Sequence, residues 1–89
     1  AEAQYFVGLL YSEDDEISEN YEEALRWYEK AANKGHGYAQ FKLGIMYYKG
    51  KGTSVDKIIA KHWLTKSIAS GTLKSKEGFM ASDILMEHL

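Results

Sequence analysis

The sequence predicts an all-α solenoid made of two helix–turn–helix repeats and a further helix at the C-terminus. The main observation is internal repetition, because residues 3–35 match residues 39–71 when the chain is shifted by 36 positions without a gap. Nine identities align, where average residue usage would give roughly two, and a period of about 20 to 50 residues is typical of stacked repeats. The identities are Ala3/Ala39, Gln4/Gln40, Gly8/Gly44, Tyr11/Tyr47, Ser18/Ser54, Ala24/Ala60, Trp27/Trp63, Lys30/Lys66 and Gly35/Gly71.

The composition excludes several other classes of protein. With 45% hydrophobic residues the chain is globular rather than disordered, and 89 residues make one small unit. The absence of proline suits helix interiors, and the absence of cysteine excludes disulfides, thiolate zinc sites and cysteine catalysis. No apolar run is long enough to span a membrane, and no signal peptide is visible. The sequence begins inside a repeat at Ala1, so we expect an excised piece of a longer protein, of unknown localisation.

The charges are unevenly distributed along the chain. Residues 1–35 carry nine acids and three bases, and residues 36–89 carry four acids and eight bases, which together give the net charge of −2. A basic half can indicate nucleic-acid binding. Its lysines are spread through helical sequence without any arginine, so we expect solvated helix faces and no nucleic-acid partner.

The first helix is expected over residues 2–12. Gly8 lies inside it, where glycine costs about 1 kcal/mol relative to alanine, and Gly44 repeats that cost in the same slot of the second repeat. We therefore expect another helix to pass close to each of these glycines. Apolar residues with the i, i+4, i+7 spacing of one buried stripe are Ala3, Val7, Leu10 and Tyr11.

A loop is expected over residues 13–20, which include four consecutive acids at residues 13–16. Its oxygen ligands do not alternate and it has no central glycine, so the pattern does not indicate an EF-hand calcium loop. Asn20 is the expected N-cap of the next helix, with Glu23 three residues later as in a capping box. That helix is expected over residues 21–34, with Ala24, Trp27, Tyr28 and Ala31 on its buried stripe and Gly35 as a left-handed C-terminal cap.

The second repeat has the same plan with a different turn. Its first helix is expected over residues 37–49, and residues 50–52 form a Gly-Lys-Gly turn. Asp56 takes the N-cap slot that Asn20 has in the first repeat. The following helix is expected over residues 57–70 and is closed by Gly71; the buried stripes of the two helices comprise Ala39, Leu43, Gly44 and Tyr47, then Ala60, Trp63, Leu64 and Ile68.

The remaining residues predict a fifth helix over residues 73–88, which covers the exposed end of the helix before it. Strict register places Met80 in the glycine slot and Asp83 in the tyrosine slot. A slip of one residue places Ala81 and Ile84 there, which is chemically better. Terminal repeats of solenoids typically diverge from the pattern in this way.

The second repeat closely resembles the Sel-one-like repeat (SLR), a relative of the tetratricopeptide repeat, through the motif Ala39-Gln40-x-x-Leu43-Gly44-x-x-Tyr47-x-x-Gly50-x-Gly52-x3-Asp56-x3-Ala60-x2-Trp63. The first repeat lacks the loop glycines, and Thr53 stands where the family usually has valine. The resemblance assigns residues 1–35 and 36–71 to two repeats and residues 72–89 to a diverged or capping helix. It implies a right-handed α–α superhelix that serves as an adaptor for other proteins, and it favours a bacterial envelope or secreted location.

By resemblance to tetratricopeptide arrays, one arc of the first helix in each repeat lines a concave groove. Aromatic residues suit a peptide-binding surface, because they offer a large contact area at a low entropic cost. The alternative is that this arc packs between repeats, with Tyr5 and Ile45 the expected packing residues and Tyr38, Tyr48 and Lys49 the expected partner contacts. The expected groove residues are Glu2, Tyr5, Leu9 and Ser12 in the first repeat and Tyr38, Phe41, Ile45, Tyr48 and Lys49 in the second.

Nothing in the sequence points to catalysis, a metal or a cofactor. His36, His62 and His88 share no helical face, and no pair of carboxylates is placed with them. We expect a non-enzymatic scaffold that binds a peptide or protein segment in the groove and inserts in no membrane. One alternative is a structural, self-associating array segment in which acidic residues 13–23 meet basic residues 42–66. Another is an envelope-associated hydrolase.

Overall fold

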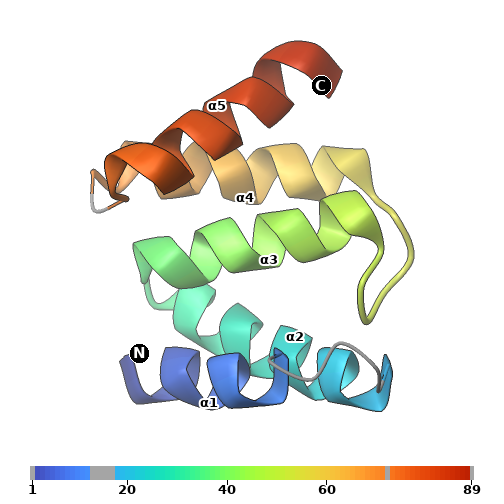
Figure 1. Cartoon of the computed structure of the whole chain (residues 1–89). Coiled ribbons are helices and arrows are strands. Elements are labelled where there is room, and N and C mark those ends of the chain that lie inside the picture. The colour runs from blue at the N-terminus through green and yellow to red at the C-terminus, as the bar shows by residue number, and fades with distance from the viewer. Residues whose placement is uncertain (1, 13–17, 72, 89) are drawn as a thin grey trace.

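The computed structural model describes residues 2–12, 18–71 and 73–88. These residues form α-helices and turns without a strand, so the predicted all-α repeat fold is confirmed (Figure 1). None of the described helices is both long enough and apolar enough to cross a lipid bilayer. The helices are α1 (Glu2–Ser12), α2 (Ser18–Asn33), α3 (Gly37–Lys49), α4 (Lys57–Ala69) and α5 (Ser75–His88).

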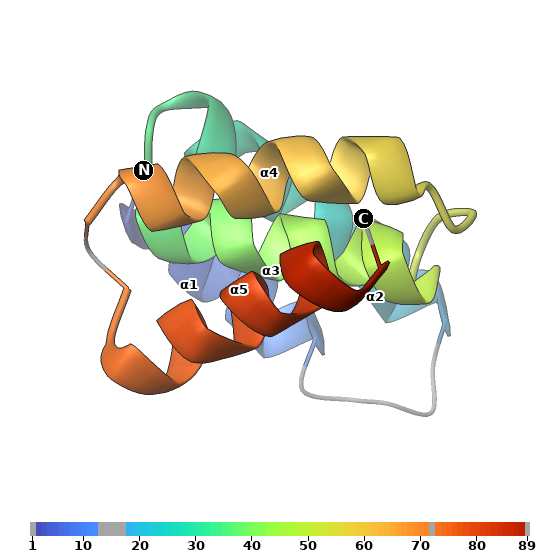
Figure 2. The ribbon, with the colours of Figure 1, turned by 90° about the horizontal axis from the view of Figure 1, so that it is seen from above.

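Successive helices pack on one another, α1 on α2, α2 on α3, α3 on α4 and α4 on α5. Figure 1 shows the α1–α2 pair at one end of the stack, α5 at the other end and α3 between them. Seen from above, α4 and α5 lie on opposite sides of α3 (Figure 2). The central helix α3 therefore contacts helices toward both ends of the molecule.

The predicted signals at two helix ends are present in the structure. Gly35 follows α2 with a φ of 90°, and the His36 amide donates to the carbonyl of Ala31 at 3.1 Å, which is the long bond of a Schellman cap. At the start of α4, the carboxylate of Asp56 accepts a hydrogen bond from the Ile59 amide at 3.0 Å. The predicted N-cap of α4 is therefore confirmed.

The core consists of two clusters, one between α2 and α3 and one that joins α3, α4 and α5. Tyr28 and Leu64 occupy the same slot of the two repeats and are fully buried. A Cβ atom added to Gly8 would lie 2.7 Å from the Tyr28 ring, and one added to Gly44 would lie 2.8 Å from Leu64 Cγ. The expected close approach at both glycines is confirmed. The first cluster comprises Tyr21, Ala24, Tyr28, Ala31, Ala32, Ala39, Leu43 and Met46, and the second Phe41, Leu64 and Ala81.

The start of α2 differs from the prediction. The helix begins at Ser18, so Asn20 lies inside it and is not its N-cap. The reason is tertiary, because Tyr21 is buried in the first cluster and the turn after α3 packs against the same point. A Cβ atom on Gly52 would lie 2.6 Å from the Tyr21 carbonyl oxygen. Residues 13–17 of the expected loop lie outside the described residues.

The predicted buried stripe of α1 is wrong in three of its four residues. Ala3 and Tyr11 are exposed, and Leu10 is 71% exposed. Their counterparts Ala39 and Met46 are buried because α3 packs this face against α2. No helix of the described part of the chain covers the same face of α1, so these apolar residues meet solvent.

One further expectation, for Ile68 of α4, is wrong. Ile68 is exposed, and Ser67 is buried in its place with its hydroxyl donating to the carbonyl of Leu64 at 2.7 Å. Trp27 and Trp63 are partly buried, and Trp63 packs against the first cluster. In each helix the residue that follows the tryptophan, Tyr28 or Leu64, is fully buried.

The structure has α5 in the slipped register. Ala81 is fully buried in the second cluster, whereas Met80 and Asp83 are exposed. α5 thereby covers α4, as predicted. The ends of both helices are close to the predicted positions, since α4 ends at Ala69 and α5 begins at Ser75.

Candidate functional site

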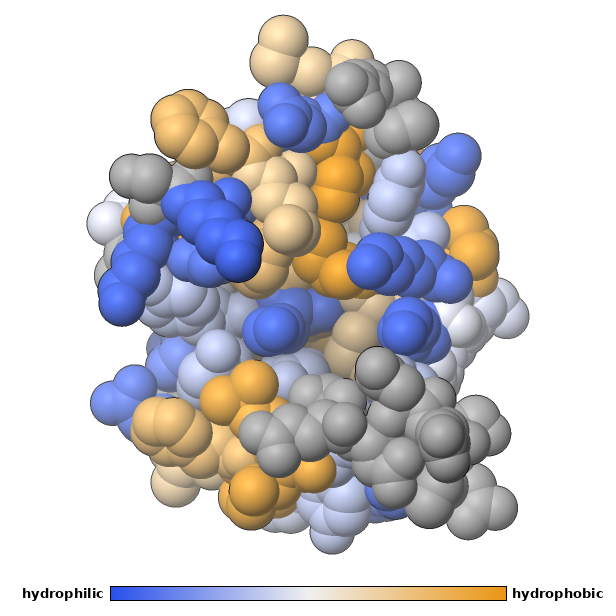
Figure 3. All heavy atoms as spheres, in the orientation of Figure 1, coloured by the Kyte–Doolittle hydropathy of each residue, from blue (hydrophilic) through white to orange (hydrophobic). Residues whose placement is uncertain are grey.

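A cleft of about 670 Å³ lies where α1, α3 and the first turns of α5 meet. Its residues come from three separate parts of the chain and converge only in the folded structure. Figure 3 shows this side of the molecule, with hydrophilic side chains across its middle and hydrophobic groups above and below them. The cleft is lined by Glu2, Tyr5, Phe6, Leu9, His36, Tyr38, Phe41, Lys42, Ile45, Lys49, Lys74, Lys76, Glu77 and Met80.

Most residues of the predicted groove arc lie in this cleft. Tyr48 is partly buried and does not line it, and the side chain of Ser12 lies outside the described residues. Phe6 and Lys42, which occupy the same position in the two repeats, were not predicted from the sequence. Phe6 lies one helical turn after Glu2, and Lys42 lies one helical turn after Tyr38, so both adjoin the predicted arc. The predicted residues that the structure brings together are Glu2, Tyr5, Leu9, Tyr38, Phe41, Ile45 and Lys49.

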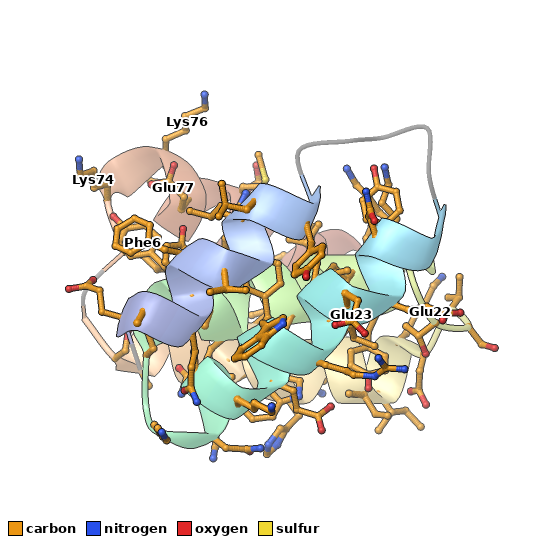
Figure 4. The ribbon with its side chains drawn as sticks, turned by 90° about the horizontal axis from the view of Figure 1, so that it is seen from below. Phe6, Glu22, Glu23, Lys74, Lys76 and Glu77 are labelled. Carbon is orange, nitrogen blue, oxygen red and sulfur yellow. The ribbon has the colours of Figure 1, made fainter. Side chains whose placement is uncertain are left out.

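The contribution of α5 was also missed, because the register of this helix was open. Lys74, Lys76, Glu77 and Met80 lie around its start and border the cleft. Figure 4 shows Phe6 of α1 on the same edge of the molecule as Lys74, Lys76 and Glu77, while Glu22 and Glu23 of α2 lie away from them. Part of the charge of the cleft therefore depends on how the last helix docks.

Several lining residues combine packing with partial exposure. Phe41 is buried in the second cluster and Ile45 packs against it, whereas Tyr5 packs against the first cluster. Phe6 is 55% exposed and Met80 is 44% exposed. The cleft thus has a packed floor and accessible apolar side chains on its two sides.

Aromatic rings form a corner at one end of the cleft. The Tyr5 ring stacks on the His36 ring with centroids 4.6 Å apart, and its centroid is 6.2 Å from that of Tyr38. The Tyr38 hydroxyl accepts a hydrogen bond from the Lys74 amide at 3.3 Å. This contact links α3 to the segment that enters α5 and fixes the corner.

His36 is held in place by two of its neighbours. Its Nδ1 accepts a hydrogen bond from the Ala39 amide at 3.2 Å, which makes it the N-cap of α3. The ring proton is therefore on Nε2, which lies 3.4 Å from Glu2 Oε1. Because the capping nitrogen is already engaged, the ring has a structural role at the edge of the cleft.

Burial raises the pKa of Tyr5, and the nearby Tyr38 and Glu77 raise it further. The phenol therefore stays protonated at neutral pH and offers a neutral hydroxyl to the cleft. Within residues 2–12, 18–71 and 73–88, no group of three or more His, Asp or Glu residues is placed to hold a metal ion. Of the other histidines, His62 lies on α4 against Trp63, and the side chain of His88 lies outside the described residues.

Comparison with known proteins identifies the repeat. The family model of the Sel1 repeat matches residues 1–36 and residues 37–72. The chain belongs to the Sel1 repeat family. Proteins built from Sel1 repeats generally mediate protein–protein interactions and are generally non-enzymatic.

Similar segments occur inside much longer proteins. The chain is 38% identical over 61 residues to chitin synthase regulatory factor 3 of Schizosaccharomyces pombe, covering 68% of this chain and 6% of that protein. It is 33% identical over 76 residues to DAP3-binding cell death enhancer 1 of Rattus norvegicus, covering 85% of this chain and 14% of that protein. Among solved structures, a Sel1 repeat protein from Oxalobacter formigenes superposes with a TM-score of 0.79 at 35% identity, covering 93% of this chain and 23% of its own.

Proposed function

We propose that this chain is a non-enzymatic interaction module that holds a peptide or protein segment of a partner in the cleft between α1, α3 and α5. The observation that carries the proposal is the set of half-exposed apolar side chains that three helices bring to one concave surface. Phe6 and Met80 are the most accessible of them. Concave surfaces with aromatic groups and a few polar ones are preferred sites for ligands, and aromatic anchors contribute much of the affinity at interfaces.

The rigidity of the cleft supports the same role. The His36 cap and the hydrogen bond from the Lys74 amide to Tyr38 fix the aromatic corner before any partner arrives. A preformed surface loses little conformational entropy on binding, which favours affinity. The name of the rat relative states that it binds another protein, and a protein partner for this chain is consistent with that name.

Selection from a random peptide library displayed on phage tests the proposal. The selected peptides are titrated against the wild-type protein, the Phe6→Ala variant and the Phe79→Ala variant. Phe6 lines the cleft, whereas Phe79 is 69% exposed on α5 and does not line it. We expect Phe6→Ala to raise Kd about tenfold or more, since tenfold corresponds to about 1.4 kcal/mol, and Phe79→Ala to change Kd less than about twofold.

The two phenylalanines make a matched pair, because both side chains are largely solvent-exposed and neither belongs to a core cluster. Circular dichroism of both variants checks that the fold is kept. Peptides that bind both variants equally well would place the binding surface outside the cleft. A library that yields no peptide dependent on Phe6 would also contradict the proposal.

A further inference from the structure

We infer that the segment bound in the cleft is acidic, with carboxylates on both sides of an apolar side chain. This inference rests on the proposed function and specifies the chemistry of the partner. The first observation is charge, because four lysines and two glutamates are among the described residues that line the cleft, although the whole chain has a net charge of −2. The charge of these described lining residues is therefore opposite in sign to that of the molecule. The lysines are Lys42, Lys49, Lys74 and Lys76.

The spacing of two of these lysines indicates how the carboxylates are arranged. Lys42 and Lys49 lie on the same side of α3 with Ile45 between them, and all three line the cleft. At 1.5 Å rise per residue, the two lysines are about 10 Å apart along the helix axis. We call Lys42, Ile45 and Lys49 the α3 ridge. A partner that binds this ridge would place an apolar group on Ile45 and one carboxylate toward each lysine.

The positive surface continues beyond the cleft. Lys42, Ile45 and Lys49 also line a smaller hollow of about 160 Å³, together with Lys51 and residues of α2. Among the residues that the structure describes, no carboxylate lines this hollow. The Lys51 ammonium lies 3.3 Å from the Tyr21 hydroxyl and 4.9 Å from the centre of its ring. An acidic segment would therefore meet cations on both sides of the α3 ridge.

The same surface fits a peptide better than a nucleic acid. Ile45 lies between Lys42 and Lys49, where a continuous phosphate backbone would have to cross an apolar side chain. Glu2 and Glu77 also border the cleft and would repel successive phosphates. No arginine, the residue best suited to bind phosphate in a bidentate manner, is among the lining residues. Carboxylates on a peptide are discrete charges and can be placed to avoid both glutamates.

Charge reversal on the ridge provides the test. The phage library is selected separately against the wild type, against the Lys42→Glu/Lys49→Glu double variant and against a Lys57→Glu/Lys61→Glu control. Lys57 and Lys61 are exposed on α4 and do not line the cleft, so the control makes the same change in net charge at another place. Circular dichroism confirms the fold of both double variants.

We expect the wild type and the control to enrich acidic peptides with an apolar residue between the acids, and the cleft variant to enrich basic ones. The most frequent wild-type peptide should bind the cleft variant about tenfold more weakly. Replacing its Asp and Glu by Asn and Gln, or raising the salt concentration, should weaken its binding to the wild type, as expected for interactions between exposed charges.

Each contrary result has a separate meaning. The acidic inference is overturned, and the proposed function is left intact, if the selected peptides require Phe6 but are not acidic. The same holds if the wild type and the Lys42→Glu/Lys49→Glu variant select peptides of the same sequence character. If no selected peptide requires Phe6, the proposed function fails and this inference fails with it. A mixed-sequence single-stranded oligonucleotide that binds more tightly than the peptide, and through Lys42 and Lys49, would also overturn the inference.

Discussion

Gly44 is a point of close approach between α3 and α4, and its substitution tests how rigid that contact is. A Cβ atom there would lie 2.8 Å from Leu64 Cγ and 3.2 Å from the Leu64 backbone nitrogen. The side chain could rotate away, but the backbone of α4 cannot move without opening the core. We expect Gly44→Ala to lower the free energy of unfolding by about 1–3 kcal/mol, as overpacked cores do, measured by urea denaturation.

Gly78 is the control for this prediction, because it also lies within a helix but has no atom within 4 Å of an added Cβ. Gly78→Ala should raise the free energy of unfolding by about 0.5–1 kcal/mol, since alanine favours the helix over glycine. Equal effects of the two substitutions would show that helix propensity alone decides them. In that case the close approach at Gly44 would have no energetic role.

At the scale of the helix, one of the two N-caps predicted from the sequence is present in the structure and the other is not. Asp56 caps α4 through its bond to the Ile59 amide, so Asp56→Ala should lower the free energy of unfolding by about 1 kcal/mol. Asn20 has the corresponding slot but lies inside α2. Asn20→Ala should therefore change the free energy by less than about 0.5 kcal/mol. Thermal or urea unfolding followed by circular dichroism measures both, and a larger loss at Asn20 would contradict the observed helix start.

The elements that could be predicted are those whose signals are local. The bounds of α3 and the cap at Asp56 follow from glycines and a capping residue next to the helices. The start of α2 could not be predicted, because it depends on the packing of Tyr21 against the turn that contains Gly52, 31 residues later in the sequence. Periodicity identifies apolar residues but not the helix that covers them, so it predicted Leu10 as buried.

The candidate site likewise combines residues that could be predicted from the sequence with residues that only tertiary packing brings to it. Most of the lining residues on α1 and α3 could be predicted from the resemblance to tetratricopeptide arrays, because both helices occupy the same place in their repeats. Lys74, Lys76 and Met80 could not, since they reach the cleft through the docking of α5, whose register the sequence left open. The acidic preference that we propose depends partly on these lysines and therefore required the structure.

At the scale of the whole molecule, the two ends of the stack differ. α5 covers α4 at one end, whereas the outer face of α1 is exposed at the other. In the 89-residue chain, Leu10→Ala should therefore change the free energy of unfolding by less than about 0.5 kcal/mol. The same change at its buried counterpart, Met46→Ala, should cost about 2–5 kcal/mol.

Joining a copy of residues 1–36 in front of residue 1 tests whether the face of α1 is a stacking surface. The copied α2 would meet Ala3, Val7 and Leu10 as α2 meets Ala39, Leu43 and Met46 in the present structure, because the repeat spacing is kept. Leu10→Ala in this longer chain should then cost about 2 kcal/mol or more, measured by urea denaturation beside the same substitution in the 89-residue chain. A cost that stays near zero in both chains would show that this face of α1 does not pack as its counterpart does, even when a matching helix is supplied.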